Sequence, residues 1–75
     1  MVQMPIACLT RGVMTARLAT LHGESVAAWG IDEKGILWEL WRSQRGTWTL
    51  LVTISGTACI AASGVQSGET KGGAI

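Results

Sequence analysis

The sequence has few of the residues from which chemical sites are usually built. Its 75 residues contain no Phe, no Tyr, one His and two Cys, and the formal net charge is only +1. A charge this small gives no support for binding nucleic acid or for adsorption to a membrane surface. One His and two Cys do not supply the four ligands of a zinc site within one chain. We therefore expect no metal, cofactor, nucleic acid or small-molecule substrate.

Catalytic arrangements are also missing. His22 forms a nucleophilic triad only if the fold brings it to Cys8 or a strand Ser and to a carboxylate such as Glu24. A His at a helix end, where it favours the helix dipole, is the better interpretation. Asp32 and Glu33 are adjacent, and they are more typical of a turn than of an acid–base pair. The sequence predicts a protein that is not an enzyme.

Export and membrane signals are weak. The apolar run near the N-terminus is broken by Pro5 and is too short for a signal-peptide core of about 7–15 residues. No charged residue occurs between Gly46 and Gly68, a length that suffices to span a bilayer at about 20 residues. Thr, Ser and Gly interrupt this stretch at intervals that favour strands and turns instead. We expect no membrane span.

The length allows one domain, in which a single core supplies only about 3–5 kcal/mol, so a covalent staple or a partner is expected. Hydrophobic residues make up 48% of the chain, as in globular proteins. We predict an N-terminal arm at residues 1–9, one domain at residues 10–64 and a Gly-rich tail at residues 65–75.

The periodicity predicts one helix followed by strands. Apolar residues recur at helical spacing from Thr10, a candidate N-cap, to His22, and Gly23 follows as a left-handed C-terminal residue. Leu18 and Leu21 are expected to face inward. Strand-like runs separated by turn residues then cover Ser25–Ile31, Ile36–Ser43, Thr47–Ile54 and Thr57–Ser63. The predicted fold class is α+β, with one short N-terminal helix packed on a four-stranded antiparallel β-meander.

Two turns fix which side chains share a face. The Ser55-Gly56 loop places Val52 opposite Cys59, and the Gln44–Gly46 loop places Trp38 opposite Val52. We expect the helix to cover the face that these residues occupy. The predicted core comprises Trp29, Ile31, Ile36, Trp38, Leu40, Trp48, Leu50, Val52, Ile54, Cys59 and Ala61.

The opposite face is unusually apolar for a solvated sheet surface. Leu37, Trp41, Leu51 and Ile60 are expected to form one contiguous patch there, which is typical of an interaction surface with a Trp anchor. Two other interpretations remain: the tail folds over the patch, or the predicted registers are shifted by one residue. Base stacking on a Trp and Arg surface is a further alternative, disfavoured by the few basic residues.

Two interpretations of the cysteines also remain open. Cys8 and Cys59 are either buried thiols or one disulfide, since Cys8 precedes the helix and can reach Cys59 on the predicted core face. A bond across this loop would stabilise the fold by about 4 kcal/mol on the chain-entropy model.

One pattern runs through most of residues 8–64: Leu18–Glu24, Gly46–Thr53, Gly56, Cys59 and Ala62–Gly64. It resembles a group of short uncharacterised proteins of alphaproteobacteria and their phages, and it is a fold signature without chemistry. The resemblance implies that cellular members are exported and bridge an N-terminal and a late cysteine, matching Cys8 and Cys59. This chain departs from them because it shows no recognisable signal peptide, which favours a phage-type version.

The sequence therefore predicts a non-catalytic structural module that docks onto a larger protein assembly, or onto copies of itself, through the second sheet face. A phage virion accessory protein of the decoration or cement type, made in the bacterial cytoplasm, is the leading hypothesis. The alternative is a free periplasmic or secreted binding domain stapled by a disulfide.

Overall fold

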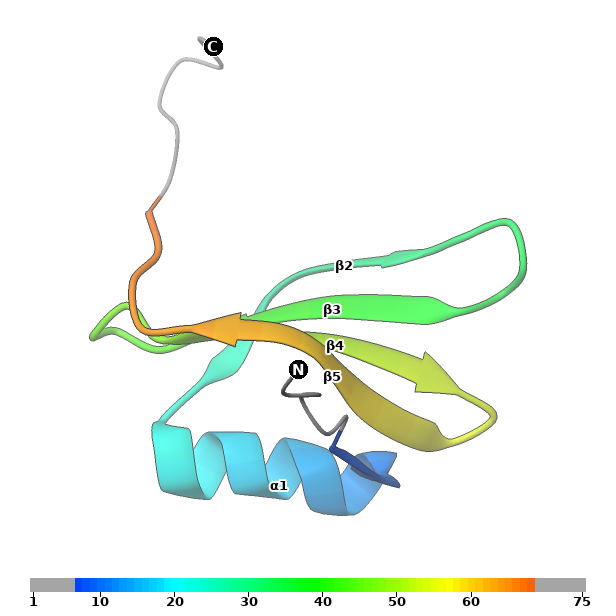
Figure 1. Ribbon diagram of the computed structural model, residues 1–75, viewed down its shortest axis with the longest axis horizontal. Helices are drawn as coiled ribbons and strands as arrows, with labels where there is room; N and C mark the ends of the chain where they lie inside the picture. The colour runs from blue at the N-terminus through cyan, green and yellow to red at the C-terminus, as the bar shows by residue number, and fades with distance from the viewer. Residues whose placement is uncertain (1–6, 69–75) are drawn as a thin grey trace, which may run out of the picture.

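The computed structural model describes residues 7–68, and it has two layers (Figure 1). The chain forms β1 (Cys8–Thr10), α1 (Arg11–His22), β2 (Ser25–Ile31), β3 (Leu37–Arg42), β4 (Trp48–Ile54) and β5 (Thr57–Gly64). Within the described residues the strands form one five-stranded antiparallel sheet in the order β1-β5-β4-β3-β2. Helix α1 lies along one face of this sheet (Figure 1).

The α+β class is confirmed, but the prediction of four strands was wrong. Residues 8–10, which were expected to form the end of an arm and a helix cap, pair with β5 as a fifth strand. A three-residue strand is too short to show a period of two, so its pairing is not visible in the sequence pattern. Residues 1–6 and 69–75 of the predicted arm and tail lie outside the described residues.

Two of the predicted turns set the registers as expected. Ser55 and Gly56 both have positive φ, 49° and 81°, as a two-residue turn between twisted antiparallel strands requires. Val52 accordingly pairs with Cys59. The loop that contains Gly46 sets Trp38 opposite Val52.

The turn between β2 and β3 is longer than the prediction assumed, so the predicted face of Trp29 and Ile31 was wrong. Asp32 Oδ1 accepts hydrogen bonds from the backbone N–H groups of Lys34 (2.8 Å) and Ile36 (3.0 Å), so Ile36 belongs to the turn. Ile31 then pairs with Leu37, and Trp29 pairs with Glu39. Trp29 and Ile31 therefore share a face with Leu37 and Glu39, whereas the prediction placed them beside Trp38.

The helix covers the face opposite to the predicted one. Its Met14 and Leu18 side chains, 2% and 3% exposed, pack with the fully buried Leu51 and Ala58. Leu21, also expected to face inward, is 67% exposed. None of the eleven predicted core residues is buried: Trp29, Ile31, Ile36, Trp38, Leu40, Trp48, Leu50, Val52, Ile54, Cys59 and Ala61.

Small and polar residues explain the side on which the helix lies. Ala58 lets the helix approach the sheet closely, and Glu39 and Thr49 on the same face are both 5% exposed. The helix segment gives each of them a partner. Arg11 forms a salt bridge with Glu39, and Thr49 Oγ1 donates a 2.8 Å hydrogen bond to Glu24 Oε1. Buried polar groups are tolerated where they are paired in this way.

The ends of α1 fix its position against the sheet. The Arg11 backbone N–H donates to Gly56 O at 2.9 Å, across the β4–β5 turn. At the other end Gly23 adopts φ 62° in the left-handed region, as predicted, and its N–H donates to Leu18 O. Thr10 holds the N-cap position without a capping side-chain hydrogen bond. The helix is therefore anchored at the β4–β5 turn and ends near the start of β2.

Candidate protein-binding face

The predicted interaction patch is not a free surface. Leu51 is fully buried under α1, and Trp41 and Ile60 pack against the same core. Leu37, the fourth member, is half-buried at the start of β3. The prediction that these four residues form an exposed docking patch was wrong, because the helix occupies the face that they share.

The other face of the sheet takes their place as the candidate site. The cross-strand pairs Trp38–Val52, Leu40–Leu50 and Val52–Cys59 place the side chains of β3, β4 and β5 in rows on this face. We call it the open face, and its large apolar side chains are Trp38, Leu40, Trp48, Leu50, Val52 and Ile54.

The exposure of the open face is graded from its centre to its ends. Leu40 and Leu50 are half-buried, whereas Trp38 is 39% and Ile54 54% exposed. Helix α1 lies on the other side of the sheet (Figure 1). Among the pairs that β3 forms with β4, the charged residue on the open face is Arg42, at the end of its strand. The centre of the face therefore presents apolar surface without a carboxylate or an ammonium group.

The disulfide crosses the β1 end of the open face. Cys8 pairs with Cys59, the two Cα atoms are 4.1 Å apart, and the bond spans 51 residues of sequence. Because Cys59 also pairs with Val52, the bond lies on the open face. The structure thus has the disulfide rather than two thiols. It ties β1 to the sheet and leaves neither cysteine available as a nucleophile.

A hydrogen bond orients Trp38 at the opposite end of the same row. Trp38 Nε1 donates to Asp32 Oδ2 at 3.0 Å, and Asp32 belongs to the turn before β3. This bond, together with those from the backbone N–H groups of Ile36 and Lys34, lowers the pKa of Asp32 below its ordinary value of 3.8. The hydrogen bond thus fixes the orientation of the indole.

The segment after β5 lies beside one end of the open face. Arg42 Nε donates to Ser67 Oγ at 3.1 Å. A Cβ atom at Gly64 would lie 2.5 Å from Trp48 Nε1, so the indole rests directly on the glycine. A hollow of about 520 Å³ remains there, lined by Ala27, Ala28, Leu40, Arg42, Trp48, Ser67 and Gly68.

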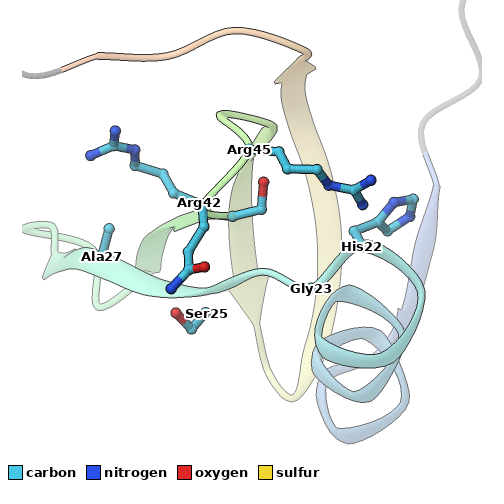
Figure 2. Close-up of a pocket in the computed structure, with 8 residues that line it drawn as sticks. His22, Gly23, Ser25, Ala27, Arg42 and Arg45 are labelled. Carbon is cyan, nitrogen blue, oxygen red and sulfur yellow. The ribbon is translucent and has the colours of Figure 1, made fainter.

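A second hollow of about 520 Å³ opens between the end of α1 and the β3–β4 turn. His22, Arg42 and Arg45 line it together with Gly23, Ser25, Ala27, Ser43 and Gln44. The Arg45 side chain reaches toward His22, whereas the Arg42 side chain extends in the opposite direction, on the side of Ala27 (Figure 2). No carboxylate lines this basic hollow. It can therefore accept an acidic group, and its lining gives His22 neither a thiol nor a carboxylate partner.

Other kinds of site find no support in the described part of the chain. Residues 7–68 contain no cluster of three or more His, Cys, Asp or Glu side chains placed to hold a metal ion. No helix within the same range is long and apolar enough to cross a membrane. No protein-family model, curated protein or solved structure matches this chain.

The sequence predicted which side chains of β3, β4 and β5 share a sheet face, but it did not predict which of the two faces the helix covers. Trp38, Leu50 and Val52 were assigned to the core because their face carries more apolar side chains. One sequence feature indicates that the helix covers the Leu51 face. That face carries Glu39, Thr49 and the small Ala58, and the possible polar partners Arg11 and Glu24 lie at the two ends of the helix.

Proposed function

We propose that this protein is a non-catalytic structural module that docks through its open face onto a larger protein assembly. The observation that carries the proposal is the uncharged centre of that face, where Trp38, Leu40, Leu50 and Val52 lie outside the core. Contiguous exposed apolar patches on small proteins mark interaction surfaces. A Trp that is already oriented suits an interface anchor, because little conformational entropy remains to be lost on binding.

The small core supports the same proposal. The described buried apolar cluster has four members: Met14, Leu18, Leu51 and Ala58. A core of this size leaves a modest margin of stability. The disulfide adds stability to the free chain. Binding of a partner to the open face of the folded protein would add more, by mass action.

The preferred assembly is a phage particle, which this chain decorates or cements after synthesis in the bacterial cytoplasm. Disulfides persist on virion surfaces as they do in the periplasm and outside the cell. The same bond favours the second candidate, a free periplasmic or secreted binding domain. In that case the open face binds a soluble partner and the chain is not part of a particle.

The two candidates are separated by sedimentation from the native source. A density gradient is fractionated and this chain is followed by mass spectrometry; co-migration with a heavy particle supports the assembly. Trp38→Ala is expected to abolish incorporation because it removes the oriented anchor. Leu21→Ala is the matched control, since Leu21 is exposed on α1, away from the open face.

Two results would overturn the assembly proposal. One is a chain that sediments only as a light species; recovery from the periplasm or the medium would then support the second candidate. The other is normal incorporation of the Trp38→Ala protein. That result removes the open face as the docking surface even if the particle association is real.

A further inference from the structure

Strand β2 is an edge of the sheet formed by residues 7–68, and it lacks the charged residues and the proline that usually protect such an edge. It is last in the strand order, and all seven of its residues are exposed. Its sequence, SVAAWGI, has no charged residue and no Pro. Edge strands in soluble proteins are normally blocked by such residues, because their unpaired N–H and C=O groups otherwise accept another strand.

Two large apolar side chains stand alongside this edge without cover. Trp29 is 68% and Ile31 62% exposed. Both lie on the helix side of the sheet, since they pair with Glu39 and Leu37. Helix α1 packs against β4 and β5 and ends near the start of β2, whereas the later part of β2, toward the β2–β3 turn, lies away from the helix (Figure 1). Trp29 and Ile31 therefore project beside the helix, and not onto the open face.

We propose that β2 pairs antiparallel with β2 of a second copy of this chain, around a two-fold axis at Gly30. With a two-fold axis perpendicular to the sheet, a residue that lies a given number of positions before the axis faces the residue that lies the same number of positions after it in the other copy. Centred on Gly30, it sets Trp29 opposite Ile31 of the second copy, and Ile31 opposite the second Trp29. Aromatic and β-branched residues are favourable cross-strand partners.

This register also avoids the irregular part of β2. The β2–β3 pairing shifts between Val26 and Ala28, and it is regular from Ala28 to Ile31. A contact centred on Gly30 uses only this regular half. The irregularity, which normally protects an edge, lies beyond it.

Charge supports a second copy as the occupant. In the proposed dimer the turn that follows Ile31 in one copy approaches the first half of β2 in the other, where Ala27 lines the basic hollow with Arg45 and His22. The incoming turn carries the carboxylates of Asp32 and Glu33 and the ammonium group of Lys34. Each copy thus brings an acidic turn to the basic end of its neighbour, and the symmetry forms this contact twice.

The dimer is independent of the proposed docking function. The axis leaves both helices on one side of a continuous ten-stranded sheet, with both open faces on the other. Two docking faces would then act in concert, so avidity would strengthen attachment to a repetitive partner. The contact is only a few residues long, so we expect a weak dimer that forms between micromolar and millimolar concentration.

Sedimentation equilibrium of the full chain, with its disulfide intact, tests the proposal. The wild-type protein should dimerise. Ile31→Lys should raise the dissociation constant of the dimer about tenfold or more, because the substitution places an ammonium group opposite Trp29 of the second copy. Leu21→Lys and Ile54→Lys are matched controls at positions 67% and 54% exposed. Both should dimerise like the wild type.

Nuclear Overhauser spectroscopy on a mixture of isotope-labelled and unlabelled wild-type chains tests the register without a mutation. We expect a contact between the Ile31 methyl of one copy and the Trp29 indole of the other. A monomer at millimolar concentration overturns the proposal, as does an unweakened Ile31→Lys dimer that remains folded by circular dichroism. Loss of the dimer in Ile54→Lys alone, or a missing contact in a dimer, overturns the β2 register.

Discussion

Arg11 and Glu39 are joined by two hydrogen bonds between the first turn of α1 and the middle of β3. The guanidinium donates from Nε to Oε1 at 3.2 Å and from Nη2 to Oε2 at 2.7 Å. The Glu39 side chain is 6% exposed and that of Arg11 is 42% exposed. The helix therefore shields a carboxylate on the sheet face that it covers.

Removal of Arg11 should destabilise the protein more than loss of an ordinary surface charge. In Arg11→Ala the largely buried Glu39 carboxylate has no other cationic partner among residues 7–68. We expect a loss of about 2 kcal/mol, discounted for the exposure of Arg11. Arg17→Ala, an exposed arginine on the same helix, is the control. Urea unfolding measures both, and equal free energies of unfolding for the two variants would contradict this account.

Trp38 and Leu51 show how far the sequence determines this fold. Turn chemistry at Gly46 and at Ser55-Gly56 was enough to predict that Trp38 faces Val52 and Leu51 faces Ile60, and both pairs are present. An alternating strand sorts its side chains into two sets, but the alternation does not say which set the helix covers. The count of apolar residues favoured the set with Trp38, whereas the helix packs on Leu51.

The choice depended on contacts that join distant parts of the chain. Glu24 meets Thr49, and Arg11 meets Glu39, over separations of 25 and 28 residues. A periodicity argument treats such polar residues as solvent-facing, so it counts against the face that they occupy. The free edge at β2 is visible in the sequence only as an uncharged run, and its exposure follows from the strand order.

Substitution of Gly64 should disturb the end of the open face. A Cβ atom there would lie 2.5–3.1 Å from three atoms of the Trp48 indole, so the ring must move. We expect Gly64→Ala to lower the free energy of unfolding by about 1–3 kcal/mol and to change the tryptophan fluorescence. Gly68→Ala, where nothing lies within 4 Å, is the matched control and should change neither. An unaltered spectrum in Gly64→Ala would show that the indole does not rest on this glycine.

Reduction of the disulfide should remove much of the stability of the free chain. The Cys8–Cys59 bond closes a loop of 51 residues, for which the chain-entropy model gives about 4 kcal/mol. We expect dithiothreitol to lower the melting temperature sharply in thermal unfolding followed by circular dichroism. The Cys8→Ala/Cys59→Ala double variant should melt as the reduced protein does and should not respond to dithiothreitol. A reductant-dependent melting temperature in that variant would mean that the effect does not come from this bond.

Acid should release the Trp38 indole from the turn that holds it. The pKa of Asp32 is lowered in the folded protein, chiefly by the hydrogen bond from the Trp38 indole and then by the Ile36 N–H, so the ionised carboxylate stabilises the fold. That stabilisation is complete above the unfolded-state pKa and is lost as the pH falls through the lower folded-state value. The Trp38 indole N–H resonance should therefore shift with a midpoint below pH 3.8. The Trp29 indole serves as an internal control, and Asp32→Asn should abolish the transition. A midpoint at or above 3.8 would show that the carboxylate does not hold the indole.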